Sequence, residues 1–91
     1  MKVTVRVFGD ISAVIGRRHE LDLPEGATIT TIAARVGEKT GQRQGYLGDF
    51  RVSSKDLSIL VNGKSIEMIN GILTPLNDGD EVVIMQPTAG G

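Results

Sequence analysis

The residues with the clearest chemical potential form the C-terminal tail, which reads Pro87, Thr88, Ala89, Gly90 and Gly91. Pro87 lacks a backbone N–H and so stops strand pairing, while the two glycines lack a Cβ and can thread a narrow channel. The terminal carboxylate of Gly91 is a poor electrophile until it is activated, for example as an acyl-adenylate. Because the sequence contains no nucleotide-binding motif, we expect a partner enzyme to use ATP for this step. The alternative is an inert, frayed terminus.

Other residue types that could do chemistry have simpler structural explanations. His19 stands alone on the inward side of an alternating segment, and we interpret it as a structural histidine. Residues 62–65, Asn-Gly-Lys-Ser, match the end of a phosphate-binding loop, but Ser58 occupies the position that requires glycine. Asp78 and Asp80 fit an Asp-Gly turn better than a metal site. We therefore expect no catalytic acid, base or nucleophile, no bound cofactor and no metal in this chain.

Composition narrows the class of protein further. The 91 residues carry ten basic and eleven acidic side chains, for a net charge of −1, and neither sign is concentrated. We expect no nucleic-acid partner, because binding to phosphates normally requires a basic face. No apolar run approaches the roughly 20 residues that span a bilayer, so we expect no membrane partner either. The sequence has no cysteine, which excludes disulfides and thiol chemistry and fits a cytoplasmic protein.

The tail must be held by a folded domain, and the first part of the chain shows the periodicity of strands. Residues 2–8 alternate strictly between valines and larger or polar side chains, and residues 18–23 alternate again. Both segments are predicted strands, because strand side chains point to opposite faces in turn. The apolar stretch 11–15 between them is predicted to form one helical turn.

A helix is predicted next. Apolar residues recur at positions i, i+3, i+4 and i+7 over residues 29–36, which is the spacing of one face of an amphipathic helix. Thr28 is the expected N-cap and Gly41 the expected C-cap. Gly37 should weaken the last turn. The following segment, 42–55, is polar and contains glycines, and we expect a long, partly ordered loop there.

The second half of the chain contains further strands. Residues 57–61 form an apolar run that ends in Asn-Gly at 62–63, a preferred two-residue hairpin turn. Residues 64–76 are expected to contain a short return strand and an irregular crossing. A turn at 77–80 precedes a final strand over residues 81–86.

This element order predicts an α+β fold of the β-grasp, or ubiquitin-like, type. The expected structure is a mixed sheet of four to five strands packed on one main helix. In this fold the first and last strands lie side by side and parallel at the centre of the sheet. We therefore predict one β-grasp domain over residues 1–86 and a flexible C-terminal tail over residues 87–91.

Pairing of the first and last strands would also produce an apolar surface beside the tail. Phe8 would project from the outward face of the first strand, and Val83 and Met85 from the same face of the last strand. Leu60 on a neighbouring strand could extend this surface, which would then serve as a partner-binding site. The alternative is that the 42–55 segment covers these four side chains.

Five motifs follow one another along nearly the whole chain: Lys2 to Gly16, Leu23 to Thr28, Val61 to Gly63, Pro75 to Val82, and the terminal Pro-Thr-Ala-Gly-Gly. In this order they resemble the MoaD/ThiS family of ubiquitin-like sulfur carriers. The Pro-Leu-x-Asp-Gly-Asp-Glu motif and the long 42–55 segment are similar to the MoaD-like branch, which is related to the small archaeal modifier proteins.

The resemblance implies a cycle of reactions at Gly91. An adenylating enzyme, similar to those that activate ubiquitin, would use ATP to adenylate the carboxylate, and sulfur transfer would convert it to a thiocarboxylate. MoaD-type members then insert the tail into the large subunit of molybdopterin synthase, while ThiS-type members serve thiazole synthesis and others supply sulfur for tRNA. The modifier branch instead joins the same glycine to lysines of target proteins.

One departure from the family pattern affects these implications. Tails in the family commonly begin with Pro-Pro after an aromatic pair, whereas this chain has Ile84, Met85, Gln86 and Pro87. Docking contacts of family members therefore need not carry over in detail. Three hypotheses stay open: a sulfur carrier, a protein modifier, and a β-grasp interaction module whose tail has no chemistry.

Overall fold

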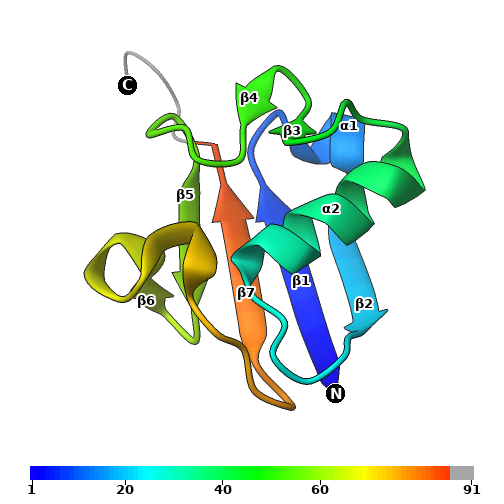
Figure 1. Ribbon diagram of the computed structural model, residues 1–91. Helices are drawn as coiled ribbons and strands as arrows, with labels where there is room; N and C mark the ends of the chain where they lie inside the picture. The colour runs from blue at the N-terminus through cyan, green and yellow to red at the C-terminus, as the bar shows by residue number, and fades with distance from the viewer. Residues whose placement is uncertain (87–91) are drawn as a thin grey trace.

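The computed structural model describes residues 1–86; the predicted tail, residues 87–91, lies outside these residues. The chain forms a five-stranded mixed sheet, with one long helix crossing one face of it (Figure 1). Short helical turns and a two-stranded ladder make up most of the connections. In chain order, the elements are β1 (Lys2–Phe8), α1 (Ser12–Ile15), β2 (Arg18–Asp22), α2 (Ile29–Thr40), β3 (Tyr46–Leu47), β4 (Phe50–Arg51), β5 (Ser58–Val61), β6 (Lys64–Ser65), the 3-10 turns η1 (Ile66–Met68) and η2 (Gly71–Leu73), and β7 (Glu81–Met85).

The strand order across the sheet is β2-β1-β7-β5-β6. β1 and β7 are parallel, with Val5 opposite Val82 and Val7 opposite Ile84. The remaining neighbours in this sheet pair in antiparallel fashion. The predicted β-grasp arrangement is therefore confirmed, including the parallel pairing of the first and last strands in the middle of the sheet.

The hydrophobic core lies between the sheet and α2. Alternation along the two central strands turns Val3, Val5, Val7, Val82 and Ile84 inward, and Val5 and Val82 are completely buried. Fully burying an aliphatic side chain of this size contributes about 1.5–3 kcal/mol, which gives the central pair much of its stability. The buried apolar residues of the core are Val3, Val5, Val7, Ile11, Ile15, Leu21, Leu23, Ala27, Ile29, Ile32, Ala33, Val36, Leu47, Leu57, Ile59, Val61, Ile66, Leu76, Val82 and Ile84.

The helix α2 begins and ends as the sequence predicts. At its start, the Thr28 N–H donates a hydrogen bond to Thr31 Oγ1 at 3.1 Å, which satisfies a backbone donor that the helix itself leaves unpaired. At its end, Gly41 has the left-handed conformation (φ 73°) that favours glycine at this position. The helix continues through Gly37 to Thr40. Within residues 1–86, no helix is long and apolar enough to cross a membrane.

The 42–55 segment has more structure than the predicted partly ordered loop. It contains the ladder of β3 and β4, in which Leu47 pairs with Phe50. The Leu47 side chain is completely buried in the core, and Phe50 and Val52 pack against the core from its edge. Strands of two residues are too short for alternation to reveal them, so sequence periodicity could not predict this ladder.

The connection between β5 and β7 agrees with the predicted hairpin and irregular crossing. Asn62 and Gly63 both have positive φ (50° and 85°), as a two-residue hairpin turn of the favoured type requires. β6 is only two residues long, and the chain then passes through the two 3-10 turns. The chain then passes the start of α2, where Thr28 forms an isolated antiparallel bridge with Pro75.

Candidate functional site

The point where the chain leaves the sheet toward the tail is held against the turn after β1. The Gln86 N–H donates to the Phe8 carbonyl at 3.2 Å, which continues the parallel ladder one residue past β7. The Gln86 side chain also takes part, because its Oε1 accepts a hydrogen bond from the Ile11 N–H at 3.0 Å. We call this set of contacts, formed by Phe8, Gly9, Ile11 and Gln86, the tail anchor.

Gly9 makes the tail anchor possible. Its φ of +92° lies in the region that residues with a Cβ rarely adopt. A Cβ at this position would also lie 2.9 Å from the Gln86 carbonyl oxygen and 3.2 Å from the Gln86 Cβ. Glycine is therefore required twice over, for the turn after β1 and for the close approach of Gln86.

The four predicted partner-binding residues come together on the sheet face that α2 does not cover. Phe8 lies opposite Met85 in the parallel pair, and Leu60 lies opposite Val83 in the antiparallel pair. Phe8 is 46% exposed and Met85 36% exposed, while Leu60 and Val83 are half-buried. We call Phe8, Leu60, Val83 and Met85 the outer patch; it lies immediately beside the tail anchor.

The 42–55 segment packs near the helices and does not cover the outer patch. β3 packs against α2, and the Gly48 backbone lies near the side chains of Ile11 and Val14. Figure 1 shows β3 beside α1, with β4 on the far side of β3. The segment contributes Leu47, Phe50 and Val52 to the core side of the sheet. The alternative that it covers the outer patch does not describe this structure.

His19 is buried and hydrogen-bonded within the fold, which agrees with its interpretation as a structural histidine. The ring is buried, with only 9% of the residue exposed, and its Nε2 hydrogen-bonds the carbonyl oxygen of Ile15 at the end of α1. Gly16 lies close enough that a Cβ there would approach His19 Nε2 to 3.3 Å. The imidazole thus joins β2 to the end of the short helix.

The acidic residues of the last turn hold the backbone together. The Asp80 carboxylate accepts hydrogen bonds from Asn62 Nδ2 at 2.9 Å and from the Asn77 N–H at 2.8 Å. Asp78 Oδ1 accepts from the Lys2 N–H at 2.7 Å. Asn62 also accepts from the Glu81 N–H at 2.9 Å. These contacts support the interpretation of 77–80 as a turn, and residues 1–86 hold no group of three or more possible metal-ligating side chains.

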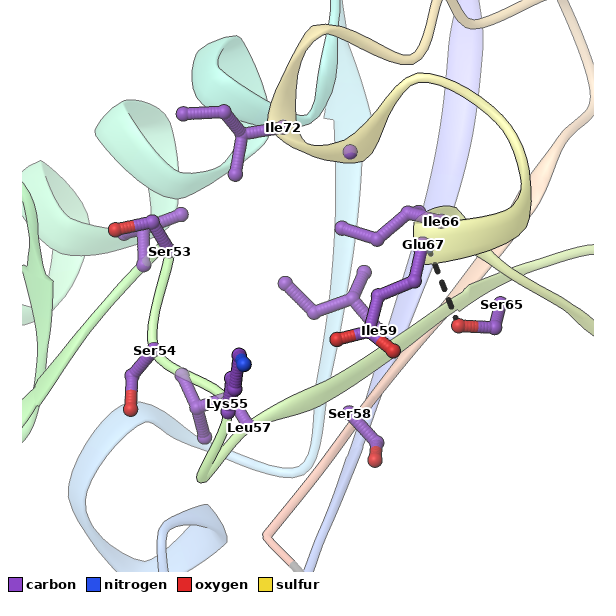
Figure 2. Close-up of a pocket in the computed structure, with 12 residues that line it drawn as sticks. Ser53, Ser54, Lys55, Leu57, Ser58, Ile59, Ser65, Ile66, Glu67 and Ile72 are labelled. Atoms are coloured by element: carbon purple, nitrogen blue, oxygen red, sulfur yellow. Dashed lines mark hydrogen bonds between the residues drawn. The ribbon is translucent and has the colours of Figure 1, made fainter.

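A hollow of about 270 Å³ lies between β5, the segment before it and the two 3-10 turns. Figure 2 shows Ile59, Ile66 and Ile72 directed toward this hollow, with serines, Lys55 and Glu67 around it. No histidine lines it. The hydrogen bond drawn there joins the Glu67 N–H to Ser65 Oγ at 3.3 Å. A serine nucleophile needs a neighbouring base, and these residues form no such pair.

Sequence reasoning did not find the tail anchor. The Gly9-Asp10 break after the first strand predicts a turn, but the contact between Ile11 and Gln86 joins residues 75 positions apart. A signal was nevertheless present, because parallel pairing of the first and last strands must bring the residues that follow each strand to the same edge of the sheet.

Fold and site together define the class of protein. The chain is a ubiquitin-like β-grasp domain that brings an apolar sheet face beside the start of a Gly-Gly tail sequence. The sequence model of the ThiS family matches residues 5–91, and the chain belongs to that family. The resemblance to the MoaD/ThiS family is thereby confirmed.

Two curated relatives and two solved structures are similar to this chain. Small archaeal modifier protein 3 of Haloferax volcanii is 25% identical over 92 residues, with both chains covered completely. A candidate sulfur carrier protein of Archaeoglobus fulgidus is 35% identical over 65 residues, which cover 71% of this chain and 67% of the relative.

The solved structures share the fold. SAMP1 from Haloferax volcanii superposes with a TM-score of 0.79 at 20% identity, with both chains covered completely. A subunit from the complex of subunits 1 and 2 of molybdopterin-converting factor from Helicobacter pylori superposes with a TM-score of 0.63 at 26% identity, again over both complete chains. The chain is thus a member of a ubiquitin-like group of sulfur carriers and modifiers, small proteins that act with partner proteins.

Proposed function

We propose that this chain is a sulfur carrier whose Gly91 carboxylate becomes a thiocarboxylate. The observation that supports the proposal most directly is the parallel pairing of β1 with β7. That pairing brings Phe8 opposite Met85 and holds Gln86, the residue before the predicted tail, beside an exposed apolar surface. A partner enzyme that binds the outer patch would receive the tail in a defined direction.

The proposed chemistry takes place at one carboxylate. In the adenylating partner, a Gly91 carboxylate oxygen attacks the α-phosphorus of ATP, pyrophosphate leaves, and a mixed anhydride with AMP results. A sulfur nucleophile then attacks the Gly91 carbonyl and AMP leaves. In this proposal the chain binds no cofactor, and ATP belongs to the partner. ATP-dependent activation fits a cytoplasmic protein.

The acceptor that we propose is the large subunit of molybdopterin synthase, with this chain as the small subunit. Support comes from the similarity to a structure described as a complex of the two subunits of molybdopterin-converting factor. In such a complex the outer patch would bind the large subunit, and the residues from Pro87 to Gly91 would carry the sulfur to the pterin precursor.

A second function is supported by the relatives among small archaeal modifier proteins, one of which matches the whole chain. In that function an amine of a target lysine attacks the activated Gly91 carbonyl and forms an isopeptide bond. Activation is the same in both functions, and only the nucleophile differs. The third hypothesis is an interaction module that uses the outer patch and has no tail chemistry.

Intact-mass spectrometry distinguishes these functions. The protein is purified from its own organism and compared with a variant that lacks Gly90 and Gly91. A sulfur carrier shows a gain of about 16 Da, from sulfur replacing oxygen, in the full chain only. A modifier yields Gly-Gly remnants on lysines of other proteins after digestion. If the shortened variant retains full biological activity, the interaction module is the correct function.

A further inference from the structure

The sheet face that carries the outer patch is electrically polarised along its strands. At the end near the tail anchor, Arg6 on β1 lies opposite Arg18 on β2. Two residues earlier on β1, Thr4 lies between Glu20 on β2 and Glu81 on β7. Arg17 adds a third exposed cation at the first end. At the other end Asp22 adds a third exposed carboxylate, but Lys2 lies directly opposite it and the Met1 amine lies 3.5 Å from it, so this end is partly neutralised.

Within residues 1–86, the arginines at the tail end form one ion pair and one cation–π contact. Like charges that lie directly opposite across an antiparallel pair destabilise a sheet, which applies to Arg6 and Arg18. Arg18 is partly compensated, because its guanidinium lies 3.0 Å from the Glu20 carboxylate. Among residues 1–86, neither Arg6 nor Arg17 forms an ion pair. The Arg6 guanidinium instead lies 5.5 Å from the centre of the Phe8 ring.

These arginines border a groove that leads from the outer patch to the tail anchor. The groove has a volume of about 460 Å³ and is lined by Arg6, Val7, Phe8, Gly9, Ser12, Arg17 and Arg18. Phe8 belongs to the outer patch and Gly9 to the tail anchor, so the groove joins the two. A partner that covers both Phe8 and the tail anchor would therefore lie close to the three guanidinium groups, which we call the basic rim.

From this arrangement we infer that the basic rim binds carboxylate side chains of the adenylating enzyme. This inference rests on the proposed function, since it names the chemistry of the surface that the activating partner presents. The partner surface has an apolar centre that covers Phe8 and Met85, and acidic residues on the side that covers Arg6 and Arg17. Arginine suits this role because its planar guanidinium donates two parallel hydrogen bonds to a carboxylate.

The opposite end of the face gives the interaction its direction. Glu81, which forms no ion pair within residues 1–86, would repel the same acidic partner residues if the chain docked in the reverse orientation. Complementary charges at a rim increase the rate of association and fix the register, whereas the apolar centre supplies most of the affinity. Correct docking places the tail anchor toward the ATP site of the partner.

The test measures the dissociation constant for the adenylating enzyme encoded in the same genome, without nucleotide, at two salt concentrations. Arg6→Glu and Arg17→Glu are compared with Lys39→Glu, which makes the same charge change on the exposed side of α2. We expect each arginine variant to bind about tenfold more weakly than the wild type at low salt, with a smaller dependence on salt. Lys39→Glu should bind like the wild type.

A stability measurement separates binding from folding. Arg6→Glu places a carboxylate opposite Arg18, so its melting temperature should equal or exceed that of the wild type while its affinity falls. Unchanged dissociation constants and salt dependence in both arginine variants would overturn the inference. If the wild-type chain is not adenylated at all, the proposed function fails together with the inference.

Discussion

Phe8 and Ile84 belong to the same pair of central strands, yet their side chains have different surroundings. Ile84 is 1% exposed and faces α2, whereas Phe8 is 46% exposed on the opposite face of the sheet. The single-residue alternation of strands separates the two environments. A residue of the outer patch can therefore be changed with little effect on the core, which makes its role in binding measurable.

Phe8→Ala should weaken binding to the partner enzyme by about tenfold or more, because exposed aromatic anchors carry a large share of interface energy. Its free energy of unfolding should fall by less than about 1 kcal/mol, as is usual for surface positions. Ile84→Ala is the control and should lose about 2–5 kcal/mol of stability. Isothermal calorimetry and urea unfolding measure the two quantities. A large loss of stability in Phe8→Ala with unchanged binding would assign this side chain to the core.

Gly9 and Gly79 allow the steric cost of the tail anchor to be measured. Both have positive φ, but a Cβ at Gly79 would meet nothing within 4 Å, whereas one at Gly9 would lie 2.9 Å from the Gln86 carbonyl oxygen. Gly79→Ala should cost about 1–2 kcal/mol from backbone strain alone. Gly9→Ala should cost about 1–3 kcal/mol more, because Gln86 must move. Equal losses in urea unfolding would show that the chain adapts to the extra methyl group freely.

At the scale of whole elements, α2 contains a glycine that the fold does not require. Gly37 is buried within the last turns, and a Cβ there would meet Tyr46 O at 3.7 Å and Gln42 Cβ at 3.8 Å, which are ordinary contact distances. Gly41, four residues later, has φ 73° and ends the helix. The two glycines therefore have opposite expectations.

Gly37→Ala should raise the free energy of unfolding by about 0.5–1 kcal/mol, because alanine loses less backbone freedom in a helix. The melting temperature should rise by about 2–8 °C in a domain of this size. Gly41→Ala should instead lower it, since alanine is strained in the left-handed conformation. Thermal unfolding of both variants checks the pair; destabilisation by Gly37→Ala would mean that β3 needs a closer approach to the helix.

The elements that could be predicted from the sequence are those whose patterns repeat. β1 alternates over seven residues, α2 keeps its apolar spacing over two turns, and Asn62-Gly63 has a turn type with a known residue preference. The strands β3 and β4 contain two residues each and the two 3-10 turns three each, which is a single period, so no pattern can repeat within them. Contacts with residues distant in the sequence determine the structure of these short elements, and local sequence patterns do not reveal such contacts.

The candidate site shows the same division. The outer patch followed from alternation and from the parallel pairing of the first and last strands, so all four of its residues could be named from the sequence. The tail anchor could not, because the contact of Gln86 with Ile11 depends on the length of the turn after β1. The basic rim was missed because Arg6, Arg17 and Arg18 belong to different strands and turns, and their meeting depends on the β1–β2 register.

At the scale of the molecule, the domain and the tail sequence should be separable. Within residues 1–86, the buried apolar core extends from Val3 to Ile84. A chain that ends at Gln86 should therefore have a melting temperature within about 2 °C of the full chain. It should bind the adenylating enzyme through the outer patch but release no pyrophosphate from ATP. A substantially lower melting temperature would assign a structural role to residues 87–91.

The central position of β7 has a consequence for folding of the chain during translation. β7 is translated after both of its neighbours, β1 and β5, and neither of those strands is adjacent to the other without it. A nascent chain can therefore form the β1–β2 hairpin and α2, but the sheet stays divided until β7 emerges. Val83 and Met85 arrive with that same strand. An incomplete polypeptide therefore lacks two of the four residues of the outer patch, the surface that we propose partner enzymes bind.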